Sequence, residues 1–324
     1  NIAKSSVADI YALIDADLQE AAGVLPLSWE SKFVGRLTKG AANALQAKTF
    51  LYRQNWAGAL AAAKQVIASG RYNLNTPFNQ IFTEAGENST ESVFEIQAFK
   101  SQTQDFGIQY ATVQGVRGAG AMDLGWGWNT PNRNLANAFE AGDPRKDATL
   151  LYSGIVNQPY GELIPDSTGV VPRPFWNKKV YTNPSVRAVN DDKQGRGVNL
   201  RVIRYADVVL MAAEAANELG GAQNTTDALA YLEMVRARAR GGNNAVLPKV
   251  TTTNQAALRD AIRKERRVEL AMEGDRFYDL VRWGIAQQVF QALGKNYQPK
   301  NRYLPIPQPE VDKSAGVLKQ NPDY

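Results

Sequence analysis

The sequence predicts a helix-dominated fold, in which tetratricopeptide-type helical hairpins carry a long loop-rich excursion and a few short strands. Apolar residues recur at helical spacing in two paired segments, residues 38–69 and 202–240. Residues 98–199 between them are rich in Gly, Pro, Asn and aromatic residues, and residues 92–97 alternate as a strand does. Two helix pairs separated by irregular sequence indicate a helical scaffold without a regular repeat array.

The first part of the chain begins with a helix and continues with a helical hairpin. Ser5 or Ser6 can cap the first helix, and Asp9 stands near its start, where a negative charge is favourable. Residues 38–69 then predict two helices joined by a turn at residues 54–55. Small residues at the predicted crossing allow the two helices to approach closely.

The second helix pair begins with residues 202–219, which are apolar almost all round and therefore predict a buried helix. A pair of glycines ends this helix, and another helix follows at residues 226–240. Glu214 lies in the middle of the buried helix. Because a charge buried alone is costly, we expect an arginine partner for it, Arg236 or Arg282.

Carboxylates also lie inside the apolar stripe of residues 255–273, a helix that Gly274 ends. Glu265 and Glu269 fall in the middle of the stripe and Glu273 at its edge. Two interpretations are open: a catalytic carboxylate pair, or a buried ion-pair network that fixes helix packing, which we favour. Arginines of an earlier helix, at positions 201 and 204, and Arg266 are further partners. The predicted structural network comprises Glu214, Glu265, Glu269, Glu273, Arg276 and Arg282.

The composition limits the chemistry available to the protein. The chain of 324 residues has 37 basic and 32 acidic residues, and this scattered excess of +5 gives no argument for nucleic acid. Cys and His are both absent from the sequence, which excludes disulfides, thiol catalysis and most zinc sites. We expect no cofactor and no metal. The composition still allows a glycosidase, because that class of enzyme needs only two carboxylates. No apolar run in the sequence has the length of a membrane span.

Three ordered motifs near the C-terminus resemble the signature of SusD/RagB-type proteins. They are ERRVELAMEGDRFYDLVRWG at residues 265–284, YLPIPQPE at residues 303–310 and LKQNPDY at residues 318–324. The resemblance implies one SusD-like domain, with a helical core in residues 1–97, an excursion in residues 98–199 that serves ligand or partner, and a second helix pair with the signature in residues 200–324. In that family the signature builds the scaffold and carries no catalytic residue.

The resemblance also implies a function. Family members are lipoproteins of the extracellular face of the outer membrane, which capture oligosaccharides and deliver them to a SusC-like TonB-dependent transporter without chemistry. A RagB-like peptide-binding subunit is the alternative, and a glycosidase fits less well. Because family members begin with a signal peptide, a lipid-bearing Cys and a long N-terminal portion, we expect this chain to be a fragment or a processed form. Membrane association would then depend on an N-terminal lipid that lies outside this chain.

The candidate ligand site is the glycine-rich segment of residues 115–134. Trp126 and Trp128 are two positions apart, so in an extended segment both rings would point to one side. Two indoles beside polar groups suit a sugar, which has an apolar face and an edge of hydroxyls. The alternative is that both rings pack inward as a small core under the loop. From composition, and without any positional match to the family, the predicted ligand-binding residues are Trp126, Trp128, Asn129, Arg133, Trp176 and Tyr160.

Overall fold

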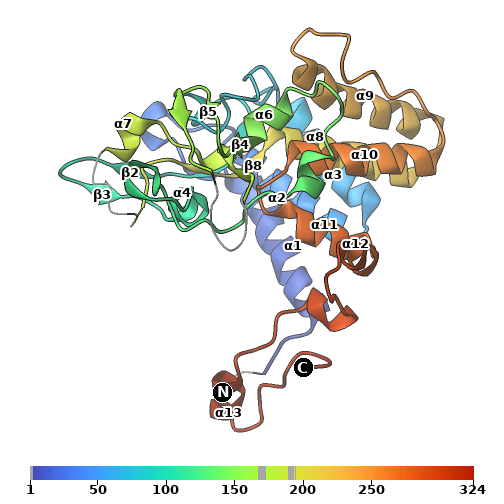
Figure 1. Cartoon of the computed structure of the whole chain (residues 1–324). Coiled ribbons are helices and arrows are strands. Elements are labelled where there is room, and N and C mark those ends of the chain that lie inside the picture. The colour runs from blue at the N-terminus through green and yellow to red at the C-terminus, as the bar shows by residue number, and fades with distance from the viewer. Residues whose placement is uncertain (1–2, 167–172, 189–192, 194) are drawn as a thin grey trace.

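The computed structural model describes residues 3–166, 173–188, 193 and 195–324, and helices dominate it (Figure 1). A frame of long helices occupies one side of the molecule, and a region of short strands and helices lies beside it. The frame helices run over Val7–Val24 (α1), Lys39–Tyr52 (α2), Trp56–Ala68 (α3), Tyr205–Leu219 (α8), Ala222–Arg240 (α9) and Gln255–Glu269 (α10). This arrangement confirms the predicted helix-dominated fold.

Helix α8 is the centre of the frame. It packs against α2 and α3 of the first hairpin and also against α9 and α10, so it contacts both predicted helix pairs. Its side chains from Tyr205 to Asn217 are all buried, in agreement with the apolar sequence on every face. Most of the main hydrophobic core is formed by this helix together with small residues of α2 and α3, such as Ala44 and Ala59.

The first helix and the first hairpin form as predicted. Ser6 caps α1, because its hydroxyl accepts a hydrogen bond of 3.1 Å from the backbone N–H of Asp9. The turn between α2 and α3 places Gln54 at a φ of 58° and uses Asn55 as the N-cap of α3. Helix α9 begins at Ala222, four positions before the predicted start at 226.

Two boundaries differ from the prediction, the first because of strand pairing and the second because of a left-handed turn. Residues 200–204 form strand β8 (Leu200–Arg204) and not the start of the buried helix, because they pair antiparallel with β1 (Ser92–Ile96). Helix α10 ends at Glu269 and not at Gly274. Met272 has a φ of 69°, so residues 270–274 form a left-handed turn that carries Glu273 outside the helix.

The excursion between β1 and β8 consists of short elements (Figure 1). Its strands form antiparallel pairs: β2 (Phe99–Lys100) with β3 (Asp105–Phe106), β4 (Leu150–Tyr152) with β7 (Phe175–Asn177), and β5 (Val156–Asn157) with β6 (Glu162–Leu163). Its helices are α4 (Tyr110–Gln114), α5 (Arg133–Ala136), α6 (Arg145–Thr149) and α7 (Pro184–Arg187). Helix α5 is a single short turn, which Asn132 caps.

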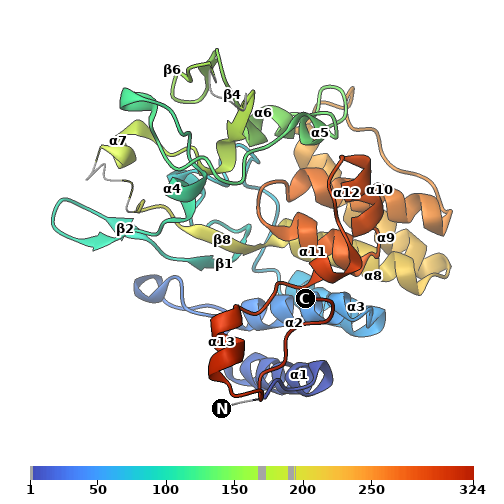
Figure 2. The ribbon, with the colours of Figure 1, turned by 60° about the horizontal axis from the view of Figure 1, so that its bottom comes forward.

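After α10 the chain continues through α11 (Asp275–Arg282), α12 (Ala286–Ala292) and α13 (Gln308–Lys313). Figure 2 shows α13 beside α1, so the two ends of the chain lie side by side. The ammonium group of Lys4 supports this arrangement, because it donates to the carbonyl of Gln320 and to Asn321, both at 3.2 Å.

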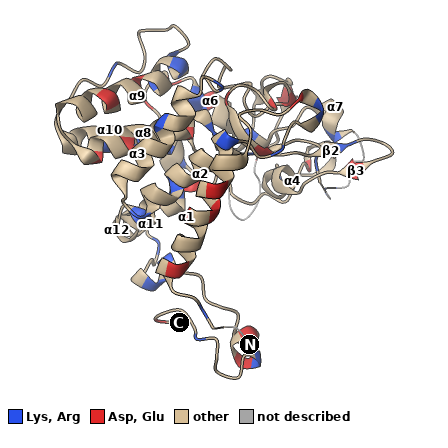
Figure 3. Ribbon diagram, turned by 180° about the vertical axis from the view of Figure 1, so that it is seen from behind, with Lys and Arg blue, Asp and Glu red and all other residues tan. Residues whose placement is uncertain are grey.

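In Figure 3 basic and acidic residues intermingle along the ribbon, and neither sign gathers over one face of this view. In the described ranges, no helix has the length and apolarity needed to cross a membrane.

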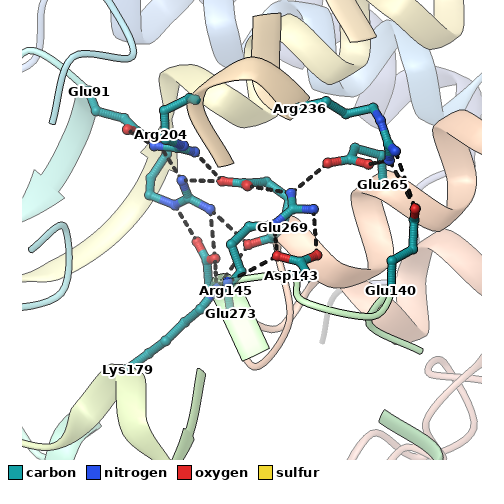
Figure 4. A network of polar contacts seen from close by, with 11 residues as sticks. Glu91, Glu140, Asp143, Arg145, Lys179, Arg204, Arg236, Glu265, Glu269 and Glu273 are labelled. Atoms are coloured by element: carbon teal, nitrogen blue, oxygen red, sulfur yellow. Dashed lines mark hydrogen bonds and ion pairs between the residues drawn. The ribbon is translucent and has the colours of Figure 1, made fainter. Parts of the chain in front are cut away.

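A network of buried charges joins the excursion to the frame (Figure 4). Its centre is Glu269, whose side chain is 0% exposed. One carboxylate oxygen of Glu269 accepts from Arg204 of β8 at 3.0 Å and from Arg238 of α9. The other accepts from Arg145 of α6 at 3.1 Å. One carboxylate of α10 therefore binds a strand, a neighbouring helix and the excursion at the same time.

Glu265 and Glu273 extend the network to either side of Glu269. Glu265 pairs with Arg145 and, at 2.8 Å, with Arg236 of α9. Glu273 pairs with Arg204 at 2.7 Å and with Lys179 at 2.6 Å, so the turn after α10 also contacts the excursion. The predicted burial of these three acids among basic partners is confirmed, although Arg145 and Lys179 come from the excursion and were not foreseen.

A second buried cluster ties α11 to α8. The Arg282 guanidinium binds both carboxylate oxygens of Glu214, and the indole N–H of Trp283 donates to one of them at 2.7 Å. Of the two partners considered for Glu214, the structure therefore selects Arg282. Asp279 pairs with Arg282 at 2.7 Å. The predicted membership of Arg276 is wrong: no acidic side chain within the described part of the chain pairs with it, and burial lowers its pKa to about 10.

Replacing Glu269 with Ala should destabilise the protein by about 3–5 kcal/mol, because three buried guanidinium groups would lose a common partner. Urea unfolding at pH 7 measures this loss. Glu310→Ala is the matched control, because Glu310 pairs with Lys313 on the surface and its removal should cost less than about 1 kcal/mol. Equal stabilities of the Glu269 variant and the unaltered protein would contradict the assignment of a structural network.

The same carboxylate predicts a pH dependence. Burial alone would raise the pKa of Glu269, but the positive charges of Arg238, Arg204 and Arg145 outweigh it and hold the pKa below the usual value. The ionised form then stabilises the folded state above the unfolded pKa of about 4.3, and this contribution is lost as the pH falls below that value. The difference in unfolding free energy between the unaltered protein and Glu269→Gln should therefore shrink between pH 5 and about pH 3. A difference that stays constant over this range would show that Glu269 keeps an ordinary pKa.

Candidate ligand-binding site

The predicted ligand loop is held against helix α4 by main-chain hydrogen bonds. The backbone N–H groups of residues 126–128 donate to the carbonyls of Thr112, Gly115 and Val113, at 2.9, 3.0 and 2.9 Å respectively. Carbonyls at the end of a helix have no partner within the helix, so the loop satisfies them. The position of the loop thus depends on the backbone and not on the tryptophan side chains.

Two glycines make this close approach possible. A Cβ atom at Gly125 would lie 2.1 Å from the carbonyl oxygen of Thr112, so only glycine fits against α4. Gly127 has a φ of 68°, a left-handed conformation that a strand does not contain. Residues 126–128 therefore do not form the extended segment on which the expectation that both rings point to one side was based.

Both loop tryptophans nevertheless face solvent. Trp126 is 47% exposed and Trp128 is 67% exposed, so neither forms the small core that was considered as the alternative. The ammonium group of Lys193 lies 5.2 Å from the ring centroid of Trp126, and Lys193 also pairs with Asp123 of the same segment. Sequence reasoning missed Lys193, because its separation from Trp126 in the chain gives no signal.

The polar residues of the predicted site divide into two groups. The amide nitrogen of Asn129 donates to Gln114 at 2.7 Å and to the carbonyl of Met272 at 3.5 Å, so this group fastens the loop and leaves only its oxygen to a ligand. Arg133 is exposed on α5, and no partner in the described ranges holds its guanidinium. The loop therefore offers two indole faces, one amide oxygen and one cation to solvent.

Nowhere in the ranges described do three or more acidic side chains gather as metal ligands would.

Trp176 and Tyr160 do not join this loop surface. Trp176 is only 4% exposed, and its indole N–H donates to the hydroxyl of Ser153 at 3.0 Å. Its ring packs with Val116 and Leu124 in a hydrophobic cluster beneath the loop, so its prediction as a ligand-stacking ring is corrected to a core role. Tyr160 packs against the same cluster and lines a different cavity, which residues 115–134 do not line.

Comparisons with known proteins agree with this architecture. The model of the SusD family matches residues 90–324. Across its whole length the chain is 30% identical to SusD-like protein P2 of Formosa agariphila, and it is 26% identical over 96% of its length to SusD-like protein P25 of the same organism. The chain spans 66% and 63% of the length of these two curated relatives.

Solved structures with the same fold include proteins whose ligands are known. The chain superposes with a TM-score of 0.82 on surface glycan-binding protein A of Bacteroides thetaiotaomicron in complex with laminarihexaose, at 26% identity, covering 98% of this chain and 72% of the other. A laminarin-binding SusD-like protein matches with a TM-score of 0.80 at 28% identity, covering 99% and 70% of the two chains.

The different environments of the tryptophans predict different costs of truncation. Trp126→Ala and Trp128→Ala should each change the unfolding free energy by less than about 0.5 kcal/mol, because both rings are exposed and the main chain holds the loop. Trp176→Ala should cost about 3–5 kcal/mol, since it leaves a cavity and removes the hydrogen bond that the Ser153 hydroxyl accepts. Urea unfolding of the three variants tests this order. A large loss in the Trp128 variant would mean that this ring belongs to the core.

Proposed function

The chain belongs to the SusD family, and on that premise we propose that it is a non-catalytic glycan-binding protein that works at the cell surface. Relatives of this fold, among them one in complex with laminarihexaose, are surface glycan-binding proteins. The observation that carries the proposal for this chain is the loop in which Trp126 and Trp128 are both exposed. Large exposed aromatic side chains on a fixed loop are typical of binding sites.

The chemistry of the loop suits a sugar. The apolar face of a pyranose ring can stack on an indole, which buries a large apolar area without a large entropic cost. At the edge of such a stack, the oxygen of Asn129 can accept from a sugar hydroxyl, and the guanidinium of Arg133 can donate to one. The loop requires no adjustment of its own backbone, because main-chain bonds to α4 already fix it.

Binding without chemistry is supported by the state of the carboxylates. A glycosidase requires two carboxyl groups that face each other across a bound sugar. Asp123 of the loop pairs with Lys193, and Glu162 of β6 pairs with Arg187. The buried acids of α10 and of the turn after it pair with arginines or lysine inside the frame, so they are not available as acid or base.

We also propose the cellular role that the family implies. In this role the protein lies on the extracellular face of the outer membrane and transfers oligosaccharides to a SusC-like TonB-dependent transporter. A lipid attached to an N-terminal segment outside this chain would anchor it. Delivery to a transporter requires reversible binding, which stacking and hydroxyl hydrogen bonds provide without a covalent intermediate.

Affinity electrophoresis and calorimetry against laminarin, laminarihexaose and a panel of other soluble polysaccharides test the proposal. We expect saturable binding of at least one glycan and a loss of about tenfold or more when Trp126 and Trp128 are both changed to Ala, because two stacking contacts disappear. Tyr278→Ala is the matched control, since Tyr278 is an exposed aromatic residue on α11 and should not affect binding.

Two other outcomes would decide against the proposal. Binding of extended peptides with no binding of any glycan would assign the protein to the peptide-binding branch. A steady release of new reducing ends during incubation with a polysaccharide would show catalysis and would overturn the non-catalytic assignment.

A further inference from the structure

A cavity of about 880 Å³ opens on a different part of the molecule from the tryptophan loop. Its walls are residues 74–83, the start of α6, the turn at residues 158–160 and the end of α9 at residues 237–241. This volume lies within the range of ordinary ligand pockets, which is roughly 300–1,000 Å³.

The cavity and the loop contact different sides of one hydrophobic cluster. Tyr181 borders the cavity and belongs to the cluster, which also contains Val116 and Leu124 from the loop side. The buried ring of Trp176 lies in the same cluster. A ligand in the cavity therefore need not touch Trp126 or Trp128.

An aromatic wall of the cavity rests on the ion-pair network. The rings of Phe78 and Phe82 are 5.9 Å apart in an edge-to-face arrangement. The ammonium group of Lys179 lies 4.9 and 4.6 Å from their centroids, and the guanidinium of Arg238 lies 5.3 Å from that of Phe78. Because the network holds these cations, the two rings are fixed in place. Phe78 is buried, with 7% of its surface exposed, and Phe82 is half-buried, so Phe82 presents the more accessible ring to the cavity.

Neutral polar groups surround this apolar surface. The side-chain amides of Asn79, Gln80 and Gln158 and the hydroxyl of Tyr160 line the cavity, and within the described ranges none of them makes a hydrogen bond. Each amide can donate and accept, as a sugar hydroxyl also does. Free amides around aromatic rings therefore match the edge and the face of a pyranose.

The charged groups in the cavity wall already have partners within the protein. Lys178 donates to the backbone carbonyl of Asp147 at 2.6 Å, and the Asp147 carboxylate accepts from the hydroxyl of Tyr152 at 2.5 Å. Arg145 pairs with Glu265 and Glu269, and Arg240 pairs with Glu233. Arg238 likewise holds network carboxylates. An anionic ligand would have to compete with these internal partners, whereas the free groups are uncharged. The cavity therefore favours a neutral ligand.

We propose that this cavity is a second carbohydrate site, which binds a segment of a neutral oligosaccharide independently of the tryptophan loop. The inference rests on the proposed function and deepens it, because two sites on one chain would hold a polymer more firmly than one. Phe82 stacks on the sugar, the buried Phe78 supports it from the core side, and the three amides with Tyr160 bind the sugar hydroxyls.

The test uses laminarihexaose and two sets of variants. The cavity variant changes Asn79, Gln80 and Gln158 to Ala, and its control changes Gln19, Gln287 and Gln288 to Ala, three exposed amides on α1 and α12. All six side chains are exposed, so both triple variants should fold. Calorimetry gives the stoichiometry, and hydrogen exchange reports protection of residues 74–83.

We expect two equivalents of laminarihexaose on the unaltered chain and one on the Trp126→Ala/Trp128→Ala variant, with protection of residues 74–83 retained. Adding the three cavity substitutions to that variant should weaken the remaining site by about tenfold or more, whereas adding the control substitutions should not.

The possible failures are distinguishable. Loss of all laminarihexaose binding and of the protection in the tryptophan variant alone would overturn the second site and leave the proposed function intact. Unchanged binding after the cavity substitutions would also overturn it. If the unaltered chain binds other glycans but not laminarihexaose, the proposal that the cavity binds neutral glucose oligomers is wrong. If the chain binds no glycan in the panel, the proposed function is wrong as well.

Discussion

The fold depends on the shared carboxylate of Glu269. It lies in the interior with no exposed surface and accepts hydrogen bonds from Arg145, Arg204 and Arg238, which belong to the excursion, to β8 and to α9. Burying any one of these charges alone would cost several kcal/mol, so each of them requires the others in place. The network therefore couples elements that the sequence separates by more than a hundred positions, and it makes the helical frame and the excursion a single cooperative unit.

This coupling divides the molecule into a rigid part and a part that can vary. Arg145 and Lys179 attach the excursion to α10 and to the turn after it. Between and beside these attachment points, short strands and turns carry exposed aromatic and amide side chains, on the tryptophan loop and around the cavity. Binding surfaces on loops that a rigid frame supports are common in proteins, because the frame bears the cost of ordering the loops.

Local sequence patterns predicted those parts of the fold that depend on local interactions. Helical periodicity located the hairpin of α2 and α3, and it also showed that Glu265 and Glu269 lie on an apolar face. What it could not supply were partners distant in the chain. Arg145, Lys179 and Arg238 gave no sign of their roles, and pairing with β1 turned the predicted helix start at residue 202 into a strand. At the site, exposure separated Trp128 from Trp176, two residues of one type whose surroundings depend on tertiary packing alone.

The attachment of the loop to α4 has a practical consequence. The three hydrogen bonds that hold residues 126–128 involve main-chain atoms only, and the glycines at positions 125 and 127 provide the close contact and the turn. Positions 126 and 128 can therefore accept a wide choice of amino acids while the backbone path stays the same. A library randomised at these two codons would therefore keep its scaffold and vary only the exposed side chains that the loop presents.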